Sequence, residues 1–154
     1  MFIYANIVTI LFALASGLGA TLLMTLIEIP AWRKWGLPGV LEWHENQVLS
    51  TKFFRLAESN LHVGGIFLLH FVNGGLGGIG FVLALILIPD ASSNLIFSGT
   101  IYGVFLWIVT LIPIHKPITG ISPWRHPNRA MPTIVSLVGH LAYGIALGLA
   151  ISLF

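Results

Sequence analysis

Long apolar stretches alternate with shorter polar segments along the chain. The apolar stretches lie near residues 5–29, 61–88, 95–114 and 134–154. A bilayer core about 30 Å thick is crossed by roughly 20 apolar residues in a helix, so each stretch is long enough to span a membrane. The pattern predicts an all-α fold, namely a polytopic membrane protein in which residues 1–154 form one transmembrane domain with a four-transmembrane-helix bundle.

The two longer polar segments differ in their content of helix-breaking residues. Residues 40–59, "VLEWHENQVLSTKFFRLAES", contain neither proline nor glycine. We expect them to form an interfacial or cytoplasmic helical segment, or an extension of the second span, with Trp43, Phe53 and Phe54 at the level of the lipid headgroups. Residues 112–132 contain five prolines, which favours a nonhelical crossing between the third and fourth spans.

The composition agrees with a membrane protein and excludes several kinds of site. Hydrophobic residues make up 56% of the chain and charged residues only 8%, so the spans leave no room for a soluble domain. The chain has no cysteine, which excludes disulfides, thiolate metal sites and cysteine catalysis.

Basic residues are confined to two of the loops that connect the predicted spans. The loop between the first and second spans carries Arg33, Lys34, Lys52 and Arg55, and the loop between the third and fourth carries Lys116, Arg125 and Arg129. Because Lys and Arg favour short cytoplasmic loops, we expect a multi-pass protein of the cell membrane with both termini outside and the basic loops cytoplasmic. No run of basic residues indicates a nucleic-acid partner; the expected surroundings are the lipid bilayer and other membrane subunits or further copies of the chain.

Polar residues recur at one depth of the predicted bundle. At 1.5 Å per residue, polar side chains on the first, second and fourth spans reach a similar level. Lipid cannot satisfy an imidazole or a carboxamide, so these side chains should face inward, hydrogen-bonded to one another or separately satisfied. The predicted interior polar layer consists of His70, His140, Tyr143, Thr21 and Asn73.

A second polar cluster is expected at the cytoplasmic end. If the second span continues back through residue 55, Arg55 and His62 share the face that carries His70. Glu28 is the one acidic residue inside a predicted span, and we expect it to pair with His62 or with Arg33.

Glycines four residues apart predict close helix packing. Such pairs let two backbones approach where the hydrophobic effect does not drive helices together. We expect the second and fourth spans to meet through these glycines, although a helix break or clearance for a flat cofactor is an alternative. The packing residues are Gly74, Gly78, Gly99, Gly103, Gly144 and Gly148.

Catalytic motifs are missing from the sequence. It contains no Gly-x-Ser-x-Gly elbow, phosphate-binding loop or His-Glu-x-x-His pattern. Glu42, His44 and Glu45 fall together in "EWHENQ", where we expect solvation in preference to a metal site. His115 and His126 are expected to contact headgroups or solvent. The sequence therefore predicts no catalytic residue.

Short motifs on all four spans resemble a known family. "GLGATLLMTLIE", "HVGGIFLLHFVNGGLGGIGF", "GTIYGVFLWIVTLIPIHKPITGISP" and "GHLAYGIALG" are similar to segments of the YagU-like family of small membrane proteins. The resemblance implies a compact four-helix membrane fold with a His-x-x-Tyr-Gly signature, carried here by His140, Tyr143 and Gly144. It implies no reaction.

Three kinds of function fit these features. The preferred one is a non-catalytic structural or accessory subunit of a larger membrane complex, such as a respiratory or membrane monooxygenase assembly, without a cofactor. The first alternative is a redox subunit that holds haem b or a metal between His70 and His140. The second is a small transporter or channel whose interior His and Glu residues bind protons.

Overall fold

The computed structural model describes residues 6–57 and 59–153, which are almost entirely helical. In this part of the chain, four helices are long and apolar enough to cross a membrane, and no strand is present. The prediction of an all-α membrane bundle is therefore confirmed. The α-helices are α1 (Ile7–Trp35), α2 (Leu41–Phe54), α3 (Val63–Leu87), α4 (Leu95–Thr110), α5 (Lys116–Thr119) and α6 (Met131–Ser152).

Local capping explains where several helices begin and end. The side chain of Asn6 accepts a hydrogen bond from the Thr9 backbone N–H at the start of α1, and Asn94 does the same for Phe97 at the start of α4. These bonds satisfy N–H groups that have no partner within the helix. Gly36 ends α1 at a positive φ of 68°, a conformation that glycine adopts without a Cβ penalty.

The third span is longer than the proline pattern predicts. The helix continues from α4 through the π-helix η3 (Leu111–His115) into α5, so the spanning segment runs from Leu95 to Thr119. Pro113 lacks the N–H that an α-helix would use at this point, and the wider π turn lets the helix pass the proline. The expected nonhelical crossing therefore begins only at Gly120.

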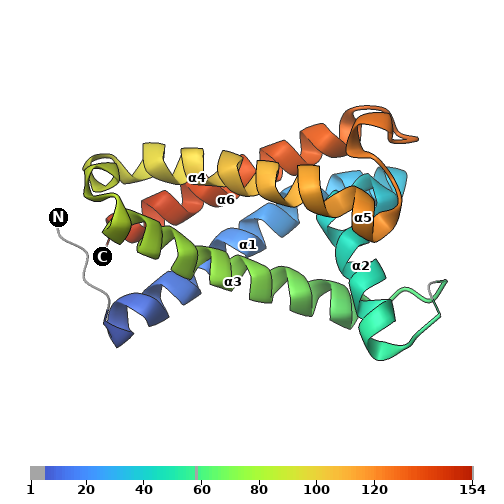
Figure 1. Ribbon diagram of the computed structural model, residues 1–154, viewed down its shortest axis with the longest axis horizontal. Helices are drawn as coiled ribbons and strands as arrows, with labels where there is room; N and C mark the ends of the chain where they lie inside the picture. The colour runs from blue at the N-terminus through green and yellow to red at the C-terminus, as the bar shows by residue number, and fades with distance from the viewer. Residues whose placement is uncertain (1–5, 58, 154) are drawn as a thin grey trace.

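The spanning helices form two pairs, and the two helices of each pair cross each other (Figure 1). α3 packs against α1, α4 packs against α6, and α1 also packs against α6. The α2 and α5 segments lie at one end of the bundle, whereas the start of α1, the end of α6 and the α3–α4 connection lie at the other. Both basic loops therefore share one end of the molecule.

Glycines bring the two helices of each pair into backbone contact. A Cβ added at Gly17 of α1 would overlap the carbonyl oxygen of Gly74 on α3, and a Cβ at Gly144 of α6 would overlap that of Gly99 on α4. The prediction that the second and fourth spans meet through their glycines is wrong about the partners. Gly74 and Gly78 contact α1, while Gly99, Gly103, Gly144 and Gly148 join α4 to α6.

Helix α2 packs against the bundle, with most of its polar side chains buried. Trp43 is buried and contacts the rings of Trp32 and Phe67, so its predicted place among the headgroups is wrong. Phe53 and Phe54 are exposed at the end of the helix. The buried polar residues of α2 are Glu45, Asn46, Gln47, Ser50 and Thr51.

Candidate functional site

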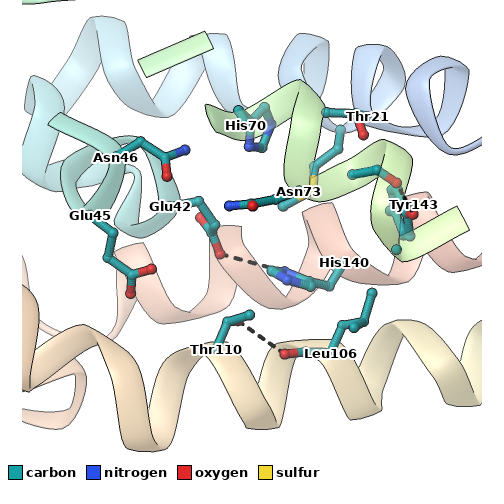
Figure 2. A pocket seen from close by; sticks show the side chains of 13 residues that line it. Thr21, Glu42, Glu45, Asn46, His70, Asn73, Leu106, Thr110, His140 and Tyr143 are labelled. Atoms are coloured by element: carbon teal, nitrogen blue, oxygen red, sulfur yellow. Dashed lines mark hydrogen bonds and ion pairs between the residues drawn. The ribbon is translucent and has the colours of Figure 1, made fainter. Parts of the chain in front are cut away.

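A cavity of about 130 Å³ lies between the helices, toward the end occupied by α2, and Asn73, predicted to be interior, is exposed at its edge. All five residues of the predicted interior polar layer line it, together with residues from α2 and α4 (Figure 2). The lining consists of Thr21, Met24, Glu42, Glu45, Asn46, His70, Asn73, Gly74, Gly77, Leu106, Thr110, His140 and Tyr143. The sequence thus identifies much of the cavity wall but not the contribution of α2.

The polar residues from the spans bond to nearby backbone carbonyls. The Thr21 hydroxyl donates to the Gly17 carbonyl oxygen at 2.7 Å, and the Tyr143 hydroxyl donates to that of Gly74 at 2.6 Å. The Nδ1 atom of His140 lies 2.9 Å from the Ser136 carbonyl oxygen. These bonds satisfy Thr21, His140 and Tyr143 separately, but Nε2 of His70 is buried without a hydrogen-bond partner in the described chain, so the prediction fails at His70.

Glu28 is the most deeply buried acidic residue of the described chain, with 0% of its surface exposed. Its Oε2 atom lies 3.7 Å from Nε2 of His70, too far for a hydrogen bond. Neither carboxylate oxygen has a hydrogen-bond partner in the described chain, although the Glu42 carboxyl and the Trp43 indole N–H approach them. Glu28 is not one of the lining residues but lies beside two of them, His70 and Glu42, and no Lys or Arg within the described residues neutralises it.

The structure does not assemble the predicted cluster of Glu28, His62 and Arg55. Helix α3 begins at Val63, so the helical face assumed to run back through Arg55 does not exist. Arg55 ends α2 in a left-handed conformation and is exposed. His62 instead packs its ring against Phe54, with ring centroids 5.1 Å apart.

Two carboxylates of α2 complete the cavity wall. Glu42 accepts a hydrogen bond from the Ser136 hydroxyl, and its Oε1 atom lies 3.5 Å from Nδ1 of His140 (Figure 2). Glu45 also faces the cavity, and burial, followed by the nearby charge of Glu42, raises its pKa to about 9. The expected solvation of these residues is therefore wrong. Their spacing with Asn46, at i, i+3 and i+4, is the sequence signal of a shared helical face.

Histidines beside α2 are buried rather than exposed to headgroups or solvent. His115 is 0% exposed, and its Nδ1 atom lies 2.7 Å from Oε1 of Glu45. His126 is 5% exposed, so the surface position expected for both histidines is wrong. The rings of His44 and His115 are 5.9 Å apart between centroids. Burial, then the proximity of His115 and His126, lowers the pKa of His44 to about 4.

The dimensions of the cavity favour small occupants. Within the described residues, no three His, Asp or Glu side chains stand in positions that could hold a metal ion. A volume of about 130 Å³ is also below the roughly 300–1,000 Å³ of pockets that enclose organic ligands and cofactors. At about 30 Å³ per molecule, the cavity has room for a few waters. The geometry therefore suits protons and water better than a haem.

No protein-family model, curated protein or solved structure matches this chain. Its function must be inferred from the fold and the cavity. Both describe an integral membrane protein in which apolar spanning helices surround a cavity lined by acidic and histidine side chains.

Proposed function

We propose that this protein transports protons across the membrane, with Glu28 as the group that binds the transported proton. The observation that carries the proposal is the burial of Glu28 with no Lys or Arg partner among the described residues, and with His70 as its ion-pair neighbour at 3.7 Å. At 1.5 Å per residue, Glu28 lies about 10 Å inside α1 from its end at Trp35, and His70 lies about 10 Å inside α3 from its start at Val63.

The surroundings of Glu28 require a proton or another small cation. An isolated carboxylate in an apolar interior is strongly unfavourable, so such groups become neutral or pair with a cation. Glu42 approaches Glu28, and two carboxyl groups close together favour sharing a proton. Ionisable residues within membrane spans are characteristic of proton relays, and His70 and His140 provide further groups that can donate and accept protons.

The accessory-subunit hypothesis loses the feature on which it depended. The glycine pairs predicted to form packing faces are occupied by contacts within this chain, so they offer no free surface for another subunit. An accessory role also needs no buried acidic residue. The haem hypothesis would need a site larger than the cavity between His70 and His140.

Proton flux into liposomes that contain the purified protein tests the proposal. An imposed potassium gradient with valinomycin sets the driving force, and a pH-sensitive dye inside the vesicles reports proton entry. We expect Glu28→Gln to lower the rate by about tenfold or more, because glutamine cannot exchange the proton. Asp90→Asn is the matched control, since it removes an acidic group from the distant η2 segment (Pro89–Ser93).

Two outcomes would contradict proton transport. Liposomes with the wild-type protein would be as tight to protons as empty ones, or Glu28→Gln would conduct as well as the wild type. A fall of equal size in Asp90→Asn would show that the loss is not specific to the cavity.

A further inference from the structure

A group of buried histidines connects the cavity with the end of the bundle that carries the basic loops. The Nδ1 atom of His44 and the Nε2 atoms of His115 and His126 are buried and have no hydrogen-bond partner within the described residues. Burying a polar group without a partner is costly, so one such atom would already call for an explanation. Three such nitrogen atoms belong to neighbouring histidines at this end of the bundle. Their grouping indicates that water enters there.

Contact with the cavity is made through Glu45. Its carboxyl group lines the cavity and also lies 2.7 Å from Nδ1 of His115. The other nitrogen of that ring, Nε2, is the unpartnered one, so the imidazole has one nitrogen toward the cavity wall and one away from it. An imidazole that can accept a proton on one nitrogen and release it from the other is suited to relay protons.

The outer end of the histidine group lies close to the surface. His126 is almost fully buried, but its neighbours Arg125 and Pro127 are exposed. The Asn128 backbone N–H donates to Nδ1 of His126 at 3.1 Å, and Nε2 makes no further hydrogen bond of normal geometry within the described residues, although the backbone of Pro38 approaches the ring. The residues on both sides of His126 in the sequence therefore reach solvent or the headgroup region.

The opposite half of the bundle offers no comparable connection. Beyond Tyr143, the interior consists of apolar residues, including Phe81, Leu85, Leu147 and Ile151. From the cavity toward the η2 end, the described spans contain no His, Asp, Glu, Lys or Arg. Access to the cavity by titratable groups is therefore one-sided.

We infer that Glu45, His115, His44 and His126 form a proton path between the cavity and the basic-loop end of the protein. The inference rests on the proposed function, because it assigns the route by which the proton of Glu28 exchanges. The path is a series of transfers between neighbouring groups, with water bridging the histidines.

Each transfer conserves protons and charge. When Glu42 has given a proton to the Glu28 carboxylate, it accepts one from Glu45 through cavity water, and Glu45 is then a carboxylate that accepts the Nδ1–H of His115. A proton binding at Nε2 of His115 forms the imidazolium. The Nδ1–H bond then breaks, an O–H bond forms on Glu45, and a neutral imidazole remains.

Exchange of the Glu28 proton for deuterium tests the path without measuring transport. The protein in lipid nanodiscs is mixed rapidly with D₂O, and infrared spectroscopy follows the shift of the Glu28 carboxyl C=O band, which is assigned by its loss in Glu28→Gln. We expect His115→Gln to slow the exchange by about tenfold or more, because the amide keeps a hydrogen bond but cannot relay a proton. His62→Gln, which changes a histidine of the same end outside the path, should exchange at the wild-type rate.

Glu45→Gln provides a second variant in case His115→Gln does not fold. It alters the other side of the same bond and must also slow the exchange. Unchanged exchange in either folded variant would overturn the path, as would an equal slowing in His62→Gln. The experiments distinguish failure of the path from failure of the proposed function. Slow exchange in His115→Gln together with undiminished flux in Glu28→Gln would refute transport and leave the path intact.

Discussion

Glu45 shows how tertiary packing changes the chemistry of one side chain. It lies on a polar segment, yet its carboxyl group is buried between the cavity and His115. Burial, then the charge of Glu42, raises its pKa from 4.5 to about 9. The protonated form is therefore favoured in the folded protein at neutral pH.

This shift predicts how stability depends on pH. A carboxyl group with a raised pKa stabilises the fold below its unfolded value near 4.5, and this contribution is lost as the pH rises toward 9. We expect the melting temperature in detergent to fall between pH 6.5 and pH 9, and to fall less in Glu45→Gln. His44 has its pKa lowered to about 4, so it is neutral throughout this range. Equal slopes for both proteins would refute the assignment of a proton to Glu45.

Residues on the spans could be predicted, whereas those on α2 could not. His70, His140, Tyr143 and Thr21 are polar within apolar stretches, so lipid alone requires them to face inward. Glu45 lies in a segment whose composition fits a solvated helix equally well. The spacing of Glu42, Glu45 and Asn46 indicates a shared helical face, but it does not specify that this face packs against the bundle.

Glycine pairs determine how closely the spanning helices approach. Their spacing predicts that a backbone contact exists, but it does not specify the partner helix. The structure pairs α1 with α3 and α4 with α6. This pairing depends on the segments that connect the spanning helices, including α2. For this reason the packing residues could be predicted and their partners could not.

Two glycines of α1 allow a matched test of this packing. A Cβ at Gly17 would overlap backbone atoms of α3, whereas a Cβ at Gly19 would meet nothing within 4 Å. We expect Gly17→Ala to destabilise the protein by about 1–3 kcal/mol, the usual range for overpacking. Gly19→Ala should be neutral or stabilising by up to about 1 kcal/mol. Unfolding in mixed detergent measures both, and equal stability of the two variants would exclude a close α1–α3 contact.

The basic and the buried ionisable side chains gather at one end of the molecule, whereas the interior toward the other end is mostly apolar. The basic loops, α2 and the buried histidines gather at the first, and the α3–α4 connection closes the second (Figure 1). The distribution of Lys and Arg predicts that the end with the basic loops lies in the cytoplasm.

Labelling of single cysteines tests this orientation. The chain has no cysteine, and two exposed serines lie in connections at opposite ends of the bundle, Ser59 between α2 and α3 and Ser93 in η2. In intact cells, we expect a membrane-impermeant maleimide to label Ser93→Cys and not Ser59→Cys, with both labelled after the membrane is opened. The reverse labelling pattern would show the opposite orientation, with the basic loops and the histidine path on the outer side of the membrane.

The division into a polar and an apolar half also determines where the membrane voltage acts. A cavity in proton exchange with one surface stays near the electrical potential of that solution, so most of the voltage falls across the apolar layer around Phe81, Leu85 and Leu147. A full membrane voltage is worth about 2.3 kcal/mol per elementary charge for every 100 mV. In the proposed transport, little of that energy acts on a proton between His126 and Glu28, and most of it acts on the passage from Glu28 through the apolar half. This passage covers most of the length of α1, about 30 Å at 1.5 Å per residue from Glu28 to Ile7.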